Sequence, residues 1–189
     1  MATDDTTEHA ARYGRAADGF SRRVHAVPDA AWDRPAPCDG WVARDIVGHL
    51  VEWIPAFLDA ADGPHLEVGP SVTDDPAGAW DDLDAGIRAL LGDPEMASST
   101  IHHPYAGTHR LDDAIGMFFL GDLVVHTWDL ARATGQDETL DPDLVHELLV
   151  GMEPMDEHLR VGGQYGPKVE VPPESDEQTR LIAFTGRQP

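Results

Sequence analysis

The stretch from Ile115 to Gly135, IGMFFLGDLVVHTWDLARATG, decides the fold that this chain of 189 residues is expected to adopt. Its spacing of apolar residues predicts a helix that is hydrophobic on nearly every side. Such a helix runs through the centre of a domain, where other helices cover all of its faces. We therefore expect the rest of the chain to be arranged around it.

Three polar side chains interrupt this apolar helix. Asp122, His126 and Asp129 follow one another at spacings of four and three residues, which places them on one stripe of the helix. A buried carboxylate or imidazole is costly unless a partner satisfies it, and a metal ion can satisfy two of them at once. The alternative is that Asp122 and His126 pair with each other and with backbone groups.

The chain is strongly acidic, with 35 aspartate and glutamate residues against 13 lysine and arginine residues and a formal net charge of −22. Such a surface repels phosphate backbones and anionic lipids, so nucleic acid and membranes are poor partners. A hydrophobic content of 41% over 189 residues is sufficient for one well-filled core. We expect a single domain over residues 1–189, with a C-terminal tail from about residue 160 to 189.

Cys38 is the only cysteine, so no disulfide can form within the chain, which fits a reducing cytoplasm. Cys38 itself is either an inert packed residue or a reactive thiol near the site. The first residues lack the basic and apolar segments of a secretion signal, and no stretch reaches the roughly 18 apolar residues of a membrane span. These features predict a cytoplasmic protein.

Apolar residues at helical spacing predict further helices on both sides of the central one. Pro55 falls inside the second of them, where a kink or an early end near Trp53 is expected. Residues 95–110 predict a long loop or a short irregular strand pair, and no strand pattern is long enough to build a sheet. The fold class that fits is all-α, an antiparallel up-down four-helix bundle with extra short helices and a long loop before the central helix. The expected helices cover residues 7–27, 40–60, 77–91, 115–135, 141–155 and 175–184.

His49 lies at the inner edge of the apolar face of the second helix and can point into the same core as the central stripe. Asp122 and His126, four residues apart, can direct their donor atoms at one centre that His49 would complete. Two imidazoles and one carboxylate leave a coordination position open, which is the pattern of catalytic zinc sites and also of non-haem iron(II) oxygenases. The predicted metal ligands are therefore His49, Asp122 and His126.

Neighbouring residues have expected roles as well. Asp129 either accepts the N–H of a ligating imidazole or forms a salt bridge with Arg132 or Arg12. Asp45 could support His49 in the same way, although its position near the start of the second helix also suits a cap. Trp53 and Trp128 are candidates for the walls of a pocket, and the other tryptophans are expected in the core.

Two motifs, PAPCDGWVARDIVGHLVEW at Pro35 to Trp53 and GDLVVHTWDLARATG at Gly121 to Gly135, together with the ending RLIAFTGRQP from Arg180, resemble the actinobacterial branch of the DinB-like superfamily that includes the mycothiol-dependent maleylpyruvate isomerases. The motifs and the ending cover roughly a quarter of the chain, and their order fits nearly its whole length. The resemblance implies a four-helix bundle with a divalent metal, usually zinc, on the positions of His49, Asp122 and His126. Nickel or iron would also suit these donors.

The chain departs from the isomerases in two respects. Asp122 replaces a glutamate and is one methylene shorter, and residues 1–189 are expected to form the bundle without the separate C-terminal domain of the isomerase. The resemblance implies a metal that lowers the pKa of a small thiol such as mycothiol, so that its sulfur attacks an electrophile at neutral pH. The chain is thus expected to be a metal-dependent thiol S-transferase or isomerase, with the electrophile entering beside residues 95–110.

Other functions remain open on the sequence. A metal-dependent hydrolase would use the same donors to activate water, and a protein without enzymatic activity would bind a metal or small ligand in a stress response. An iron(II) oxygenase is a more distant alternative. Outer helix faces could also support a homodimer.

Overall fold

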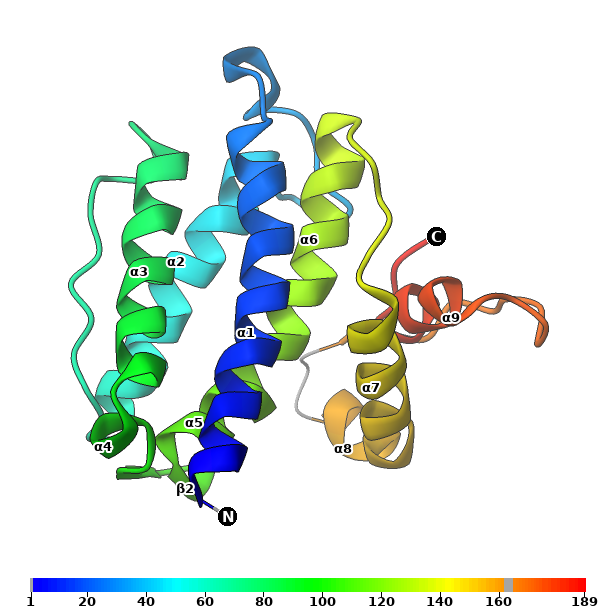
Figure 1. Ribbon diagram of the computed structural model, residues 1–189. Coiled ribbons are helices and arrows are strands. Elements are labelled where there is room, and N and C mark those ends of the chain that lie inside the picture. The colour runs from blue at the N-terminus through cyan, green and yellow to red at the C-terminus, as the bar shows by residue number, and fades with distance from the viewer. Residues whose placement is uncertain (1, 162–164) are drawn as a thin grey trace.

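The structure is a computed structural model that describes residues 2–161 and 165–189 (Figure 1). Helices dominate it, and the expected all-α class is confirmed. Four long helical segments build the body of the protein. They are α1 (Ala2–His25), α2 (Ala43–Ala60), α3 (Pro76–Gly92) and the central segment that ends in α6 (Leu120–Thr134). Helices α1 and α2 each pack against both α3 and α6, and the apolar core fills the space between them.

The directions of the helices depart in one step from the simple up-down alternation that we expected. His25 at the end of α1 contacts Asp81 near the start of α3, so these two helices are antiparallel. Gln136, just after α6, donates to the carbonyl of Arg23, so α1 and α6 run in the same direction. Helix α2 ends beside the hairpin that follows α3, where the amide of His102 donates to the carbonyl of Ala61. Helices α2 and α3 therefore run parallel, as Figure 1 shows.

The length of the segment between α2 and α3 permits this parallel arrangement. Residues 61–75 can reach about 50 Å when extended, whereas the 18 residues of α2 rise only about 27 Å. The segment is thus long enough to return along the whole of α2 before α3 begins. Its glycine and proline residues had indicated a loop, and the loop length alone leaves both directions open.

The second helix is longer than its proline suggests. It continues through Pro55 to Ala60, so an early end near Trp53 is wrong. Asp45 accepts the amide hydrogen of Val42 at 2.8 Å and caps the helix. Of the two roles expected of Asp45, the structure shows the helix cap, and among the described residues no hydrogen bond joins its exposed side chain to His49.

The central helix begins earlier than predicted and changes its pitch. It starts at α5 (Leu111–Ala114), passes through a π-helical turn, η2 (Ile115–Phe119), and continues as α6. Gly135 ends it with a φ of 74°, a left-handed conformation that favours glycine. The wide turn directly precedes the stripe that carries Asp122, and such turns often occur at functional sites.

Of the two alternatives expected for residues 95–110, a long loop or a short irregular strand pair, the structure shows the strand pair. After the short helix α4 (Pro94–Ala97), strands β1 (Thr100–His103) and β2 (Gly107–Arg110) form an antiparallel hairpin. Ile101 is the one fully buried residue in the two strands. The alternation of apolar and polar residues that marks a half-buried strand is therefore weak in this segment. The hairpin lies at the end of α2, which places it beside the central π-helical turn.

The C-terminal part packs on the outside of the four long helices (Figure 1). Helices α7 (Pro142–Met152) and α9 (Glu177–Phe184) agree closely with the prediction, and α9 packs against α7. Short helices η1 (Asp29–Ala31), η3 (Glu153–Met155) and α8 (Asp156–Val161) complete the described elements. Gly162 and Gly163, expected to mark an extended tail, lie outside the described residues. The last residues return toward α6, so the tail is part of the folded body.

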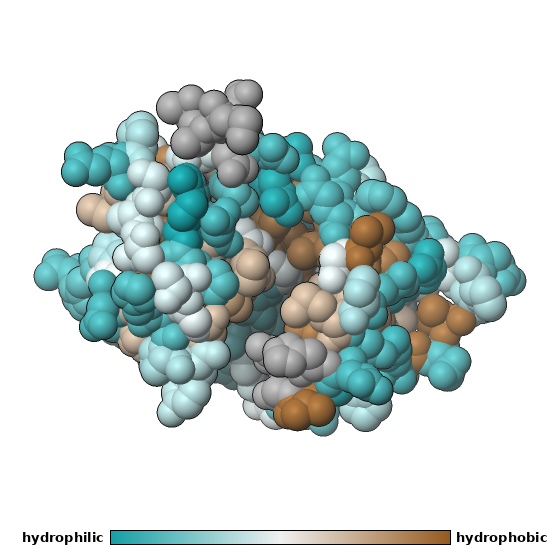
Figure 2. Space-filling view, turned by 90° about the horizontal axis from the view of Figure 1, so that it is seen from below, coloured by the Kyte–Doolittle hydropathy of each residue, from teal (hydrophilic) through white to brown (hydrophobic). Residues whose placement is uncertain are grey.

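One described helical segment, Leu111–Thr134, is long and apolar enough to cross a membrane. Most of it is buried inside the protein, as expected for a core helix of a soluble protein. The face seen from below is largely hydrophilic and is hollowed near its middle (Figure 2).

Candidate functional site

The three predicted metal ligands converge between α2 and α6. The Nε2 atom of His49 lies 2.9 Å from Oδ2 of Asp122. The Nε2 atom of His126 lies 3.3 Å from Oδ1 of the same carboxylate. One donor atom from each residue falls within 4.8 Å of the other two. The structure therefore brings together two imidazoles from different helices around one short acid.

One of these distances already matches the spacing of two ligands on a small metal ion, whereas the 2.9 Å between His49 and Asp122 is a hydrogen-bond distance that would have to widen around an ion. Two ligands bound at about 2.0–2.1 Å in tetrahedral geometry stand about 3.4 Å apart, close to the separation of His126 and Asp122. The site is also accessible from one side. The side chain of His126 is 5% exposed, whereas those of His49 and Asp122 are 31% and 22% exposed. A further ligand could thus approach from the side of His49.

Asp129 contacts the ring nitrogen of His126 that faces away from Asp122. Its Oδ2 atom accepts from Nδ1 of His126 at 2.9 Å, and the carboxylate is fully buried. Asp129 thus accepts the N–H of an imidazole, which is the first of its two expected roles. It also forms a salt bridge, the second role, but its partner is Arg187 instead of Arg132 or Arg12. Arg187 donates from Nε and from Nη2, the latter at 2.7 Å. This pair fixes the proton of His126 on Nδ1 and leaves Nε2 directed at Asp122.

Charges in the cluster are strongly coupled. Burial alone would raise the pKa of Asp122, but the adjacent imidazoles of His126 and His49 outweigh it and bring that pKa well below its usual range. Burial likewise opposes charge on His126, yet the carboxylates of Asp122 and Asp129 raise its pKa well above the usual value. Arg187 already neutralises Asp129. Asp122 is then matched by a proton on His126, and a bound cation could take the place of that proton.

Cys38 lies at the rear of the cluster. Its Sγ atom is 3.5 Å from Oδ2 of Asp129 and 3.5 Å from Nη2 of Arg187. Cys38, His126 and Asp129 form a second group whose donor atoms lie within 4.8 Å of one another. In that group Asp129 is already bound to an arginine and to an imidazole N–H, so it has less capacity for a metal than Asp122.

Aromatic rings surround the imidazoles. Trp53 donates from Nε1 to Oδ2 of Asp122 at 2.8 Å, so it lies beside the cluster and has a polar contact with it. Trp41 lies over both histidines, with ring centroids 5.2 Å from His49 and 5.8 Å from His126. Trp128 was expected as a pocket wall, but it is packed in the core with the guanidinium of Arg132 over its ring. Trp41 therefore takes the position that the sequence had suggested for Trp128.

Three functional neighbours were missed from the sequence. Arg187 and Tyr165 come from the C-terminal part, and nothing in their spacing connects them with α6. Burial raises the pKa of Tyr165 to about 12, and the negative charge of Asp122 adds to the shift, so its hydroxyl lies in the field of the site. The signal for Trp41 was present, because it precedes His49 by eight residues, but the helix start lies between them.

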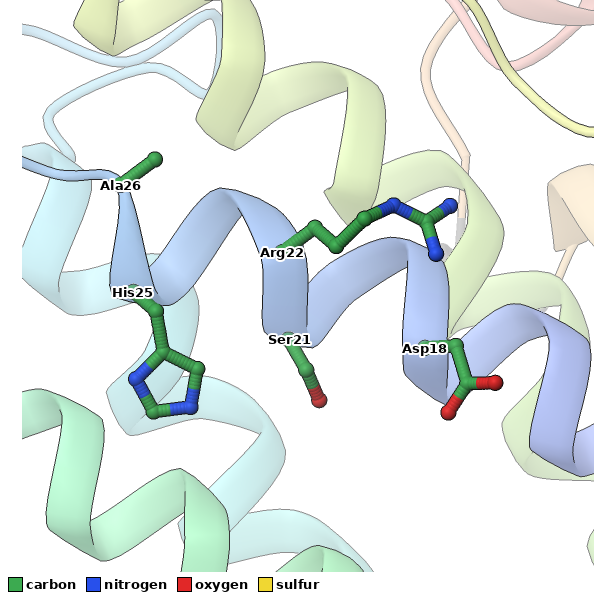
Figure 3. A pocket seen from close by; sticks show the side chains of 5 residues that line it. All are labelled: Asp18, Ser21, Arg22, His25 and Ala26. Carbon is green, nitrogen blue, oxygen red and sulfur yellow. The ribbon is translucent and has the colours of Figure 1, made fainter.

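A separate hollow of about 530 Å³ lies on α1 and is lined by Asp18, Ser21, Arg22, His25 and Ala26 (Figure 3). Asp18, Ser21 and His25 point to the same side of the helix in that view. Each of the three is bound to a residue of α3: Arg88, Trp80 and Asp81, respectively. These contacts join two helices, and none of the five residues belongs to the histidine and aspartate cluster.

Fold and site together define an all-α protein with a half-open cluster of two histidines and one aspartate between two core helices. The family model for the mycothiol maleylpyruvate isomerase N-terminal domain matches residues 13–131. The chain belongs to this family. The matched region contains His49, Asp122, His126 and Asp129, whereas Arg187 lies beyond it.

Two curated relatives come from strains of Mycobacterium tuberculosis, the uncharacterized proteins MT0763 and Rv0738. Each is 28% identical over 182 residues, which cover 92% of this chain and 94% of the relative. The similarity thus extends over the C-terminal part that the family model leaves unmatched. No solved structure shows a significant match to the chain.

Proposed function

We propose that His49, Asp122 and His126 hold a divalent metal ion, most simply zinc, and that the protein is a metal-dependent thiol S-transferase or isomerase. The observation that carries the proposal is the convergence of three donors from α2 and α6 on one half-open position. Two histidines and one carboxylate form a common catalytic set for zinc. Nickel or iron(II) would fit the same donors.

A low-molecular-weight thiol is the proposed co-substrate, and mycothiol is the particular candidate because the family description names it. A bound divalent ion would supply positive charge that lowers the pKa of a thiol placed beside it. The thiol gives its proton to solvent water and its sulfur forms a bond with an electrophilic carbon. In a transfer reaction the displaced electron pair departs with the leaving group. In an isomerisation the pair of a carbon–carbon double bond shifts to the neighbouring atoms and returns when the carbon–sulfur bond breaks and the thiol is released. A reducing cytoplasm is the compartment in which such a thiol would be available.

The residues of the chain have distinct parts in this scheme. Asp129 and Arg187 keep Nε2 of His126 directed at the site, so the ligand need not reorient before binding. Trp53 fixes one oxygen of Asp122 through its indole N–H. Trp41 covers the two imidazoles and limits the access of water from its side.

The experiment measures metal content and conjugation in the same preparations. Protein purified without chelator should contain close to one divalent ion per chain by mass spectrometry of the metals. With mycothiol and a panel of electrophiles it should form thioethers or isomerised products. His126→Ala should lose both the ion and the activity, since it removes a buried donor.

A matched control is His146→Ala, because His146 is a surface histidine on α7 that pairs with Glu177. It should retain metal and activity. Equal conjugation rates for His126→Ala and the wild-type protein would overturn the proposal. Ester or amide hydrolysis in the absence of thiol would instead assign the metal-dependent hydrolase.

A further inference from the structure

A continuous row of aromatic rings leads from the candidate site to the hairpin. On α2, His49, Trp53 and Phe57 are spaced by four residues and share one face of the helix. The ring centroid of Trp53 lies 6.0 Å from that of His49 and 5.9 Å from that of Phe57. The ring of Phe57 then lies 4.4 Å from that of His103 on β1, with only 12° between their planes.

The second side of this row comes from the π-helical turn and β2. Phe118 lies 5.0 Å from Phe57, and His109 lies 5.3 Å from Phe118. Phe119, the next residue, is fully buried and packs beneath Trp53 at 5.2 Å. We call the set of Trp53, Phe57, His103, His109 and Phe118 the aromatic strip. All five of its members are partly exposed, so their rings are recessed but reachable.

Each of the two histidines of the aromatic strip has one ring nitrogen hydrogen-bonded within the hairpin. Nδ1 of His103 accepts from the backbone amides of Tyr105 and Ala106. Nε2 of His109 lies 2.7 Å from the carbonyl of Ala106, to which it donates. These hydrogen bonds fix the orientation of both imidazole rings. The strip is therefore a partly exposed surface built from aromatic rings that pack on one another.

Charge narrows the class of molecule that such a surface can bind. None of the five residues of the aromatic strip is lysine or arginine, and the chain carries a net charge of −22. Arg110, which follows His109, donates to the buried carboxylate of Asp112. A carboxylate or phosphate on a ligand would thus find no free cation among these groups, while a flat uncharged ring would find stacking partners.

We infer that the aromatic strip binds the organic body of the electrophile, and that the substrate class is flat, uncharged, aromatic or conjugated electrophiles. The inference rests on the proposed function for the position of the reacting carbon, which would lie at the His49 end. At that end Trp53 both stacks beside His49 and holds Asp122, so the strip is continuous with the candidate metal ligands. This continuity favours a substrate over a second copy of the chain.

Binding is tested first, without any reaction. N-phenyl-1-naphthylamine is an uncharged aromatic probe, and 8-anilino-1-naphthalenesulfonate has the same rings with a sulfonate. The uncharged probe should bind more tightly to the wild-type protein. Phe57→Ala should weaken it about 10-fold, and Phe57→Leu, which keeps most of the apolar volume, about 3-fold through loss of ring stacking.

Met155→Ala is the control, because Met155 is an exposed apolar residue on η3, outside the aromatic strip. It should leave the affinity for the uncharged probe unchanged. Tighter binding of the sulfonate, or equal affinities for wild type and both Phe57 variants, would overturn the inference. The inference would also be overturned if the wild-type protein were a dimer that Phe57→Leu converts to monomers without any change in probe affinity.

Kinetics then separate this inference from the proposed function. The ratio of kcat/KM for 1-chloro-2,4-dinitrobenzene to that for iodoacetamide should fall about 3-fold in Phe57→Leu, because only the first substrate has a ring to stack. His126→Ala should abolish conjugation but keep the affinity for N-phenyl-1-naphthylamine. If the wild-type protein binds the probes as expected but transfers no thiol, only the proposed function is refuted. Thiol transfer with an unchanged ratio would refute the aromatic strip alone.

Discussion

Arg187 forms a two-point salt bridge with Asp129, which lies 58 residues earlier in the sequence. Its Nε atom is 3.0 Å from Oδ1, and its Nη2 atom is 2.7 Å from Oδ2. The same Oδ2 atom accepts from Nδ1 of His126. The C-terminal residues thereby reach the candidate metal site through one intermediate carboxylate. Because the arginine is 14% exposed and the aspartate is fully buried, the pair is shielded from competing water.

This relationship predicts that Arg187 sets the metal affinity without touching the metal. Arg187→Gln should weaken zinc binding about 10- to 100-fold, because Asp129 is then free to move away from His126. Competition with a chromophoric chelator measures the change. Arg180→Gln is the control, since Arg180 pairs with Glu153 on the surface and should leave the affinity unaltered. An unchanged affinity in Arg187→Gln would show that Asp129 holds the imidazole by itself.

Asp122 should be required for the metal but not for the fold. Asp122→Asn keeps the size of the side chain and a hydrogen-bond acceptor for Trp53, while it removes the charge that would face a cation. We expect less than one tenth of the metal content of the wild-type protein, with a helical circular dichroism spectrum that is unchanged. Full metal occupancy in this variant would place the ion elsewhere. Asp143→Asn, on the exposed first turn of α7, provides the control.

Much of the fold followed from periodicity, since the apolar faces of α1, α2, α3 and α6 repeat at helical spacing. The donors of the site could also be predicted, because Asp122 and His126 are local to one helix and His49 lies on the inner face of another. What escaped prediction depends on contacts between distant segments. The loop before α3 fits either orientation and so does not reveal the direction of that helix, and the contact of Arg187 with Asp129 depends on the packing of the C-terminal part, where α9 lies against α7.

Trp128 and Asp45 show that the position of a residue along a helix does not by itself reveal its partners. Trp128 shares the central helix with the ligands, yet its ring faces the core and Arg132, whereas Trp41 reaches the imidazoles from the preceding loop. Asp45 lies four residues before His49, but an aspartate three residues into a helix is well placed to accept from the cap residue. A π-helical turn leaves no simple mark in the sequence, because it changes hydrogen-bond spacing without requiring a particular residue.

The start of the central helix should be sensitive to acid. Asp112 is fully buried and accepts from Arg110 and from Thr6 of α1. Burial alone would raise its pKa, but these hydrogen bonds and the charge of Arg110 outweigh it and lower the pKa below its usual value. A group with a lowered folded pKa stabilises the protein above its unfolded pKa, and that stabilisation is lost as the pH falls through the folded value.

Asp112→Asn should therefore lower the free energy of unfolding by about 1–3 kcal/mol at pH 7. The difference between the variant and the wild-type protein should shrink as the pH is reduced below about 4, the usual pKa of an aspartate. Urea unfolding at a series of pH values measures both quantities. A difference that stays constant down to pH 3 would mean that the ionised carboxylate contributes nothing beyond its shape.

Cys38 provides the test between the two groups of donors that share His126. If the metal is held by His49, Asp122 and His126, then Cys38→Ser should retain one ion per chain with an affinity within about 3-fold of the wild type, since a serine hydroxyl can still donate to Asp129, which Arg187 continues to hold. If the metal is held by Cys38, His126 and Asp129, the same variant should lose the ion and the sulfur-to-metal charge-transfer band that cobalt substitution would reveal. The structure favours the first outcome, because Arg187 already occupies the carboxylate of the second group with two N–H donors. His49→Ala gives the converse test, as it should abolish binding only if the first group holds the metal.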